Sequence, residues 1–299
     1  MKNITVVIVT YRTPENIILN CLNSISKDIR VLIIENSEKF FIEEKILSKY
    51  DNVEIYCSGK NLGYGAGNNF GLKKVKTDYA LILNPDTICA DEFFNNLPEI
   101  INQTEDFSII GCQYLDDKIF MPAGFFDNQK NKEFVKKFRE NNINEISKVD
   151  WVTGQSMIIN LKKFENNEIF DEKFFLYFEE FDLCKSLMDK NENVFSCKKL
   201  KIKHLGFKSS FDENSTKRNN INHLREWHWM WSTFYFYKKN FGYFYALKKI
   251  IGKFLKAFLK TIFFSITFNR KEKEKYKYRF LGIYNAILGN SSNFRGDFK

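Results

Sequence analysis

Two groups of carboxylates stand where they could take part in chemistry, and the first is centred on Asp86. This residue closes Asn84-Pro85-Asp86, directly after the apolar run 79–83. A carboxylate at the end of a buried strand costs desolvation energy unless a positive charge meets it. Mg²⁺ or Mn²⁺ would fit, since such a cation is typically held by one or two carboxylates and by substrate phosphates. The sequence therefore predicts a divalent cation and a diphosphate at Asp86, with a plain turn or cap residue as the alternative. His204, after another probable strand, is either structural or a ligand of a metal or a phosphate.

The second group is Glu179-Glu180-Phe181-Asp182, which follows the aromatic run 174–178. An acid lodged among Phe and Tyr side chains has a raised pKa and can serve as a general base. The alternative is the first turn of a helix, where acidic side chains interact favourably with the helix dipole.

A glycine-rich segment at 59–71 is a third candidate site. Its glycines from Gly63 to Gly71 fit no register of G-x-G-x-x-G, and the segment follows the third predicted strand, so dinucleotide and hydride chemistry are disfavoured. Glycines at this spacing let the backbone approach a ligand closely, with Asn61 and Asn69 as donors to a phosphate or a sugar. The alternative is a loop that turns tightly into a helix.

These residues require elements that position them, and short apolar runs alternate with helical stretches along the first 90 residues. We expect strands at 4–9, 31–34, 53–57 and 79–83, and helices at 15–26, 41–49 and 65–74. Such alternation predicts an α/β fold with a mostly parallel sheet and right-handed crossovers. The polar residues after each strand then converge on one edge, where open α/β sheets bind ligands. Further along, we expect a loop or exposed helix at 127–148, a strand at 151–160 and a helix at 179–188.

The composition supports a folded protein without a disulfide or zinc framework. The 299 residues are 44% hydrophobic, enough for one large domain or two small ones. The six cysteines form no C-x-x-C pair, and we expect reduced, buried thiols. The apolar run 4–9 is too short for a signal peptide, which predicts a cytoplasmic location.

The net charge of +9 is concentrated at the C-terminus and does not favour nucleic acid as a partner. Residues 228–299 hold 15 Lys and Arg against 3 Asp and Glu, and the remainder is slightly acidic. Lysines at 249, 253, 256 and 260 recur among Ile, Phe and Leu, which predicts a helix with a cationic and an apolar side. The apolar stretch after Lys260 is too short for a membrane span. This helix is expected either to attach to an anionic membrane surface or to pack on the rest of the protein.

Seven ordered motifs between residues 4 and 210 carry a resemblance to a known family. They are VVIVTY, IENS, GKNLGYGAGNNFG, LNPDT, WVTGQSMII, FDEKFFLYFEEFDLC and HLGFKSS. Together they resemble the family 2 inverting glycosyltransferases of GT-A fold, particularly the rhamnosyltransferase-like group of surface-polysaccharide assembly. The resemblance implies a GT-A domain at 1–227 and a C-terminal basic, aromatic helical region at 228–299. It also implies sugar transfer from a dTDP- or UDP-linked donor, with dTDP-rhamnose favoured, to a glycan or lipid-linked glycan hydroxyl. Together with the basic C-terminal region, which can attach to an anionic membrane surface, this predicts a location at the cytoplasmic face of the inner membrane.

The same resemblance implies roles for individual residues. Glu180 would be the general base with Glu179 beside it, and Asp86 would hold the metal with His204 as a further ligand. Trp151, Gly154 and Gln155 would line the acceptor side. The donor nucleotide would contact Thr10, Tyr11, Glu35, Asn61, Gly63, Tyr64, Asn69 and Asn84. Glu35 and Glu180 stand where the family usually has Asp, so each keeps the charge on a longer side chain.

Two other functions are compatible with the sequence. A nucleotidyltransferase that makes the activated sugar shares the sheet and an acidic metal site, although it should show a Gly-rich signature after the first strand. The segment Thr10-Tyr11-Arg12-Thr13-Pro14 contains no Gly. The other is a catalytically inactive glycan- or lipid-binding paralogue of the same fold.

Overall fold

The computed structural model describes the chain in two compact units that interleave along the sequence. The described residues are 3–104, 106–115, 121–165, 167–206 and 218–295, without the side chains of 218 and 219. The first unit takes residues up to 62, then 66–170 and the described residues from 183 to 206. The second takes 63–65, 171–182 and the described residues from 218 onward.

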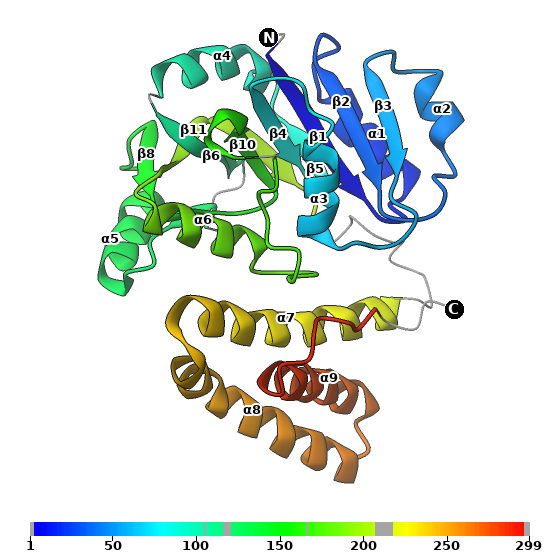
Figure 1. The fold of residues 1–299 in the computed structure, drawn as a ribbon, viewed down its shortest axis with the longest axis vertical. Coiled ribbons are helices and arrows are strands. Elements are labelled where there is room, and N and C mark those ends of the chain that lie inside the picture. The colour runs from blue at the N-terminus through cyan, green and yellow to red at the C-terminus, as the bar shows by residue number, and fades with distance from the viewer. Residues whose placement is uncertain (1–2, 105, 116–120, 166, 207–217, 296–299) are drawn as a thin grey trace. The chain divides into compact units, whose positions relative to one another are not determined.

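The first unit contains, within its described part, a nine-stranded sheet in the order β3-β2-β1-β4-β10-β6-β11-β5, with β8 paired to β11 (Figure 1). Its strands are β1 (Ile4–Thr10), β2 (Arg30–Glu35), β3 (Val53–Cys57), β4 (Tyr79–Leu83), β5 (Thr87–Cys89), β6 (Phe107–Tyr114), β8 (Ile146–Val149), β10 (Ser156–Asn160) and β11 (Asn193–His204). Strand β1 pairs in parallel with β2 and β4, and β2 pairs in parallel with β3, which confirms the predicted parallel sheet. Strand β10 lies antiparallel between β4 and β6, and β5 and β8 pair antiparallel with β11, so the whole sheet is mixed.

Helices follow the strands as the alternation predicts. They are α1 (Glu15–Asn23), α2 (Glu43–Leu47), α3 (Tyr64–Leu72), α4 (Phe93–Gln103), α5 (Asn128–Arg139) and α6 (Glu179–Asp189), with a 3₁₀ turn at Leu161–Lys163. Helix α3 carries the glycine-rich segment. A Cβ at Gly71 would lie 2.7 Å from Val7 and 2.8 Å from Ile34, so this glycine lets α3 pack closely against β1 and β2. Close packing therefore accounts for part of the glycine content.

Three expectations need correction. The stretch 127–148 contains a strand, β8, besides the helix α5. The stretch 151–160 is two strands, because a turn at 153–155 separates β10 from β9 (Trp151–Val152), which pairs with β7 (Ala123–Gly124) in a small second sheet. Cys57 is exposed because it ends β3 at the edge of the sheet, whereas the other five cysteines are buried and free as expected.

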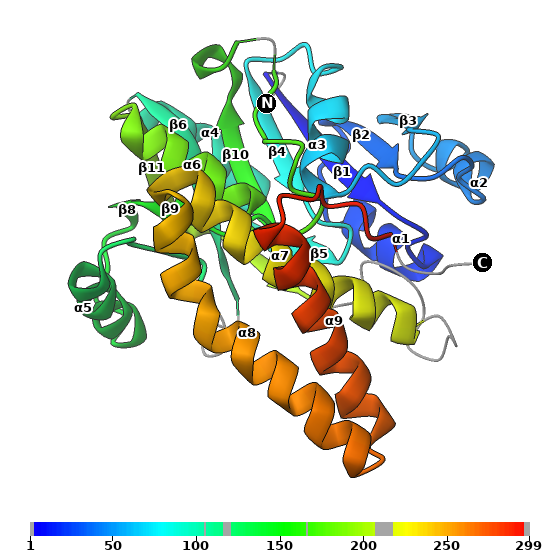
Figure 2. The same ribbon diagram turned by 60° about the horizontal axis from the view of Figure 1, so that its bottom comes forward.

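The second unit is built around helices α7 (Arg218–Phe241), α8 (Tyr243–Ile266) and α9 (Arg270–Ile287), which pack against one another. Helices α8 and α9 form a hairpin (Figure 2). The core includes Trp231, Phe234, Ile250 and Ile283, all buried. Helix α7 runs through residue 227, and the domain boundary expected there stays a prediction. None of the described helices combines the length and hydropathy needed to cross a membrane.

Candidate active site

The carboxyl ends of β1 and β2 bring Thr10 and Glu35 together in the first unit. The two residues are register partners, and Thr10 Oγ1 donates a 2.6 Å hydrogen bond to Glu35 Oε2. Glu35 Oε1 accepts from Ser37 Oγ at 2.6 Å and from the Arg12 backbone N–H at 3.3 Å. Glu35 is only 1% exposed, so these hydrogen bonds satisfy a carboxylate that burial would otherwise penalise. Tyr11, next to Thr10, is half-buried.

Strands β5 and β11 bring Asp86 and His204 together, although the two residues are far apart in the chain. His204 pairs with Thr87 across the antiparallel ladder, and the Leu205 backbone N–H donates to the Asp86 carbonyl at 2.8 Å. His204 Nε2 then lies 3.4 Å from Asp86 Oδ1. Asp86 is 1% exposed. The pKa of the nearby Cys21 thiol is raised, first by the burial of Cys21 itself and then by the charge of Asp86. Phe207–Ser210, which complete the last motif of the sequence, lie outside the described residues.

This pair suits a divalent cation that is shared with a substrate. Neighbouring ligands of an octahedral cation with bonds of about 2.1 Å lie about 3 Å apart, close to the separation of Asp86 Oδ1 and His204 Nε2. No group of three or more His, Cys, Asp or Glu side chains arranged for a metal occurs among the described residues. Phosphate oxygens and water are the usual further ligands of Mg²⁺ beside a nucleotide.

The turn between β9 and β10 places Gln155 next to Asn84. The Asn84 backbone N–H donates to the Gln155 carbonyl at 2.9 Å. Tyr114 Oη donates to Gln155 Oε1 at 2.8 Å and lies 3.2 Å from Thr153 Oγ1. Gly154 is in the same turn, and Trp151 begins β9 and is half-buried. Tyr114 was not among the predicted site residues, although its place at the end of the buried strand β6 would have indicated this edge of the sheet.

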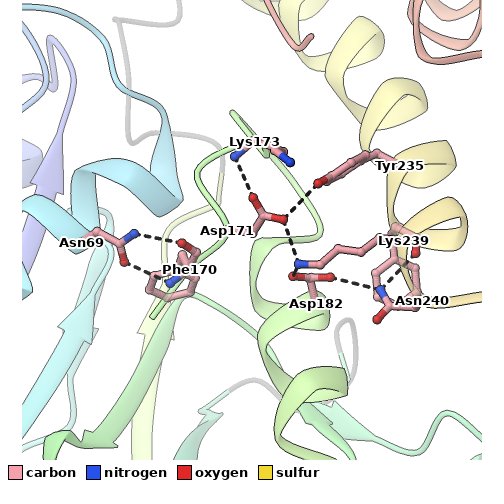
Figure 3. A network of polar contacts seen from close by, with 9 residues as sticks. Asn69, Phe170, Asp171, Lys173, Asp182, Tyr235, Lys239 and Asn240 are labelled. Carbon is pink, nitrogen blue, oxygen red and sulfur yellow. Dashed lines mark hydrogen bonds and ion pairs between the residues drawn. The ribbon is translucent and has the colours of Figure 1, made fainter. Parts of the chain in front are cut away.

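The side-chain amide of Asn69 forms hydrogen bonds to the backbone of a distant segment. Its Nδ2 donates to the Phe170 carbonyl at 2.9 Å, and its Oδ1 accepts from the Phe170 backbone N–H at 3.0 Å (Figure 3). The same Oδ1 also accepts from the Ile169 backbone N–H at 3.1 Å. The residue is buried, so it fixes the backbone at 169–170. A donor contact by Asn69 stays a prediction, as does one by the half-buried Asn61.

In the second unit, Gly63 and Tyr64 lie against the aromatic run that precedes the acidic cluster. The Tyr64 backbone N–H donates to the Phe175 carbonyl at 3.0 Å. Gly63 has a φ of +89°, and a Cβ there would lie 2.2 Å from the same carbonyl oxygen. Only glycine fits this contact without a shift of the backbone.

Glu179 and Glu180 begin α6 and differ in exposure. Glu179 is 2% exposed, and burial together with the Glu180 charge raises its pKa well above the ordinary value. Within the described residues, Glu179 Oε1 has no hydrogen-bond partner. Glu180 is half-buried, and burial also raises the pKa of the neighbouring Tyr177 to about 12. The acid of raised pKa expected in this cluster is thus Glu179, while Glu180 is the more accessible carboxylate.

The fold matches glycosyltransferases of known structure. The chain superposes on mannosyltransferase PcManGT from Pyrobaculum calidifontis, solved with GDP-Man and Mn²⁺, with a TM-score of 0.55 and 9% identity, covering 96% of this chain and 87% of that one. For GalNAc-T7, solved with UDP, GalNAc and Mn²⁺, the TM-score is 0.53 at 13% identity, covering 79% and 50%. The protein therefore has the GT-A fold of glycosyltransferases.

The sequence comparison defines the family more closely. The glycosyl transferase family 2 model matches residues 5–177, and the chain belongs to this family. It is 25% identical to the low-salt glycan biosynthesis hexosyltransferase Agl10 of Haloferax volcanii, over 66% of this chain and 65% of the relative's length. It is also 25% identical to rhamnosyltransferase WbbL of Escherichia coli, over 57% and 70%. The teichoic acid poly(glycerol phosphate) polymerase of Staphylococcus epidermidis matches at 25% identity over 64% of this chain, which spans 31% of that protein.

Proposed function

We propose that this protein is an inverting glycosyltransferase that moves a sugar from a nucleotide-diphosphate donor to a glycan hydroxyl during surface-glycan assembly. The observation that carries the proposal is the approach of His204 Nε2 to Asp86 Oδ1 at the end of β5, in a chain of family 2. A buried carboxylate and an imidazole at this edge provide two protein ligands for a cation that also binds a diphosphate.

We assign the donor nucleotide to the residues at the ends of β1 and β2 and in the following loops. Thr10, Tyr11 and Glu35 would face the nucleoside, with Asn61, Gly63, Tyr64, Asn69 and Asn84 as further contacts. The leading donor is dTDP-rhamnose; the name of the E. coli relative, a rhamnosyltransferase, supports the choice of rhamnose as the sugar. Trp151, Gly154 and Gln155 would contact the acceptor.

The residues of this chain then divide the work of the transfer. Asp86 and His204 would hold Mg²⁺ or Mn²⁺, which when bound neutralises the charge of the leaving diphosphate. Glu180 accepts the proton of the acceptor hydroxyl while that oxygen bonds to the anomeric carbon. The bond from the anomeric carbon to the diphosphate breaks in the same step, which inverts the configuration. Glu179 lies beside the base and takes no proton from the acceptor.

Helix α8 provides a surface for a membrane partner. Its packed side carries Ala246, Ile250 and Ala257, which are buried. At about 100° per residue, a different side carries large apolar side chains that are exposed: Phe244, Ile251, Leu255, Leu259, Ile262 and Ile266. The lysines at 249, 253, 256 and 260 share a third side of the helix, between the packed side and the exposed apolar side, and the exposed Lys248 lies within the apolar side. The helix therefore has an apolar side that internal packing does not use.

An anionic bilayer surface fits this side of α8. Residues 243–279 contain eleven Lys and Arg against two Glu, and each juxtamembrane cation contributes about 1 kcal/mol near an anionic leaflet. Exposed Phe, Leu and Ile side chains can enter the interface while lysine stems extend to the headgroups. We propose that this surface holds the enzyme at the cytoplasmic face of the inner membrane, where a lipid-linked acceptor would be available.

A thermal-shift panel tests the function. The purified protein is heated with dTDP-rhamnose, other dTDP- and UDP-sugars and GDP-mannose, each with Mg²⁺ or Mn²⁺. A donor at 100 times its Kd should stabilise the protein by about 2.7 kcal/mol. We expect one nucleotide class to raise the melting temperature, and Asp86→Asn to reduce that rise. No shift with any nucleotide sugar would contradict the proposal.

A further inference from the structure

In the second unit, one ammonium group joins the two ends of the segment that carries the acidic pair. Lys239 Nζ lies 2.8 Å from Asp171 Oδ2 and 2.6 Å from Asp182 Oδ2 (Figure 3). Asp171 and Asp182 enclose the aromatic run together with Glu179 and Glu180. Lys239 on α7 thus closes residues 171–182 into a loop.

Other residues on α7 secure the same loop. Tyr235 Oη donates to Asp171 Oδ2 at 3.1 Å, and Asn240 Nδ2 donates to Asp182 Oδ1 at 3.1 Å (Figure 3). Ser232 Oγ donates to the Leu176 carbonyl at 2.9 Å. Positions 232, 235 and 239 follow the i, i+3, i+7 spacing of one helix face. One face of α7 therefore contacts the loop at several points.

The loop contains strained backbone directly before the acids. Tyr177 and Phe178 have φ values of 71° and 72°, a conformation that bulky side chains rarely adopt. Such strain persists only where surrounding contacts hold it. Trp229 on α7 supplies them, since its ring lies 5.2 Å from that of Tyr177 and 5.5 Å from that of Phe178.

The positive charge of Lys239 stabilises its ion pairs with Asp171 and Asp182. Burial acts to lower its pKa, but the hydrogen bonds to Asp171 and Asp182 outweigh burial and hold the pKa above the ordinary value. Burial likewise acts to raise the pKa of Asp171, yet the bonds from Lys239 and the Lys173 backbone leave it below the ordinary value. Asp182 is buried, so loss of the ammonium would leave a desolvated carboxylate without its cation.

We propose that Lys239 is a positioning residue for sugar transfer, acting through the Asp171–Asp182 closure to hold Glu180 in its working geometry. The inference rests on the proposed function, in which Glu180 is the general base. A misplacement of about 1 Å by a remote substitution can cost about 100-fold in rate. Lys239 should therefore affect turnover more than donor binding.

The test compares Lys239→Gln and Lys239→Arg with Lys238→Gln. Lys238 is the adjacent residue on α7 and lies over the Tyr243 ring, so the control removes the same charge from the same helix. We expect Lys239→Gln to lower kcat by about 10- to 100-fold with a donor Kd within about twofold of wild type. Lys239→Arg should recover most of the rate, because it restores a cation to both carboxylates, and Lys238→Gln should match wild type.

Hydrogen exchange separates this inference from the function itself. Amides of residues 172–181 should exchange faster in Lys239→Gln than in wild type or Lys238→Gln, whatever the substrate. Unchanged kcat or unchanged exchange in Lys239→Gln would overturn the inference, as would a parallel loss of donor affinity and rate that Lys239→Arg does not recover. A wild-type protein that transfers no sugar would refute the proposed function, even if the loop loosens as expected.

Discussion

His204 Nε2 lies 3.4 Å from Asp86 Oδ1 because β5 and β11 pair antiparallel at the edge of the sheet. Because this pair would hold the cation, we expect the loss of Asp86 to lower the transfer rate more than the loss of any other site residue. Asp86→Asn removes the full charge of the Asn84-Pro85-Asp86 element and should nearly abolish transfer. Chelation of the wild type should have the same effect. Full activity of Asp86→Asn in excess chelator would show that the site works without a metal.

Glu180→Gln should leave donor binding nearly intact and lower turnover, because the amide keeps the shape and loses the basicity. General-base contributions are typically about 10²- to 10⁴-fold. Glu179→Gln is the matched control and should have the smaller effect, since Glu179 is buried. Steady-state kinetics with donor titration checks both variants. A larger loss of turnover in Glu179→Gln than in Glu180→Gln would identify Glu179 as the base. Wild-type turnover in both variants would mean that the acidic cluster only forms the first turn of α6.

Glu179 also predicts how stability depends on pH. Its pKa in the folded protein is raised above the ordinary value of 4.5, chiefly by burial and then by Glu180. The folded state thus holds this proton more tightly than the unfolded state, and the associated stability, complete below pH 4.5, is lost as the pH rises through the folded pKa. The side chain in Glu179→Gln carries no charge at any pH, so this variant should not lose stability in this way as the pH rises. Melting temperatures from pH 4 to 8 should show the variant gaining on wild type; a constant difference would contradict the assignment.

We expect the triple change of Lys253, Lys256 and Lys260 to Glu to release the protein from anionic vesicles at low salt. High salt should weaken the binding of the wild-type protein to the same vesicles. Replacing Leu259 and Ile262 by Ser should weaken it by removing apolar contact. The control changes three exposed lysines of α5 to Glu: Lys132, Lys136 and Lys137. Sedimentation with phosphatidylglycerol vesicles measures the difference. Equal binding of all variants would mean that α8 makes no membrane contact.

The strands were predictable because β1, β2 and β4 are short apolar runs buried on both sides, followed by polar residues. Asp86 and His204 each stood out from their own neighbours in the sequence. Their approach required the pairing of β5 with β11, which is a contact between distant parts of the chain. Local patterns indicate which residues end a strand, but not which strand ends meet.

The sequence did not predict the contacts that the side chains of α7 make with residues 171–182. Lys239 looks like any lysine of a basic helix until Asp171 and Asp182 are brought to it. The difference in burial between Glu179 and Glu180 also depends on packing around adjacent positions of one helix. The hydrogen bonds of the Asn69 amide to the backbone at 169–170 also follow only from the folded loop, and the expected ligand contact of this residue stays a prediction.

Product analysis measures the proposed sugar transfer itself. The wild-type protein is incubated with dTDP- and UDP-sugars, Mn²⁺ and a panel of p-nitrophenyl glycosides, and the released nucleotide and sugar products are identified by mass spectrometry and NMR. We expect nucleoside diphosphate release from one donor class and a new glycosidic bond of inverted configuration, both greatly reduced in Asp86→Asn and Glu180→Gln. Pyrophosphate release from dTTP or UTP with a sugar 1-phosphate, and no nucleoside diphosphate from any donor, would contradict the proposed transfer and identify a nucleotidyltransferase.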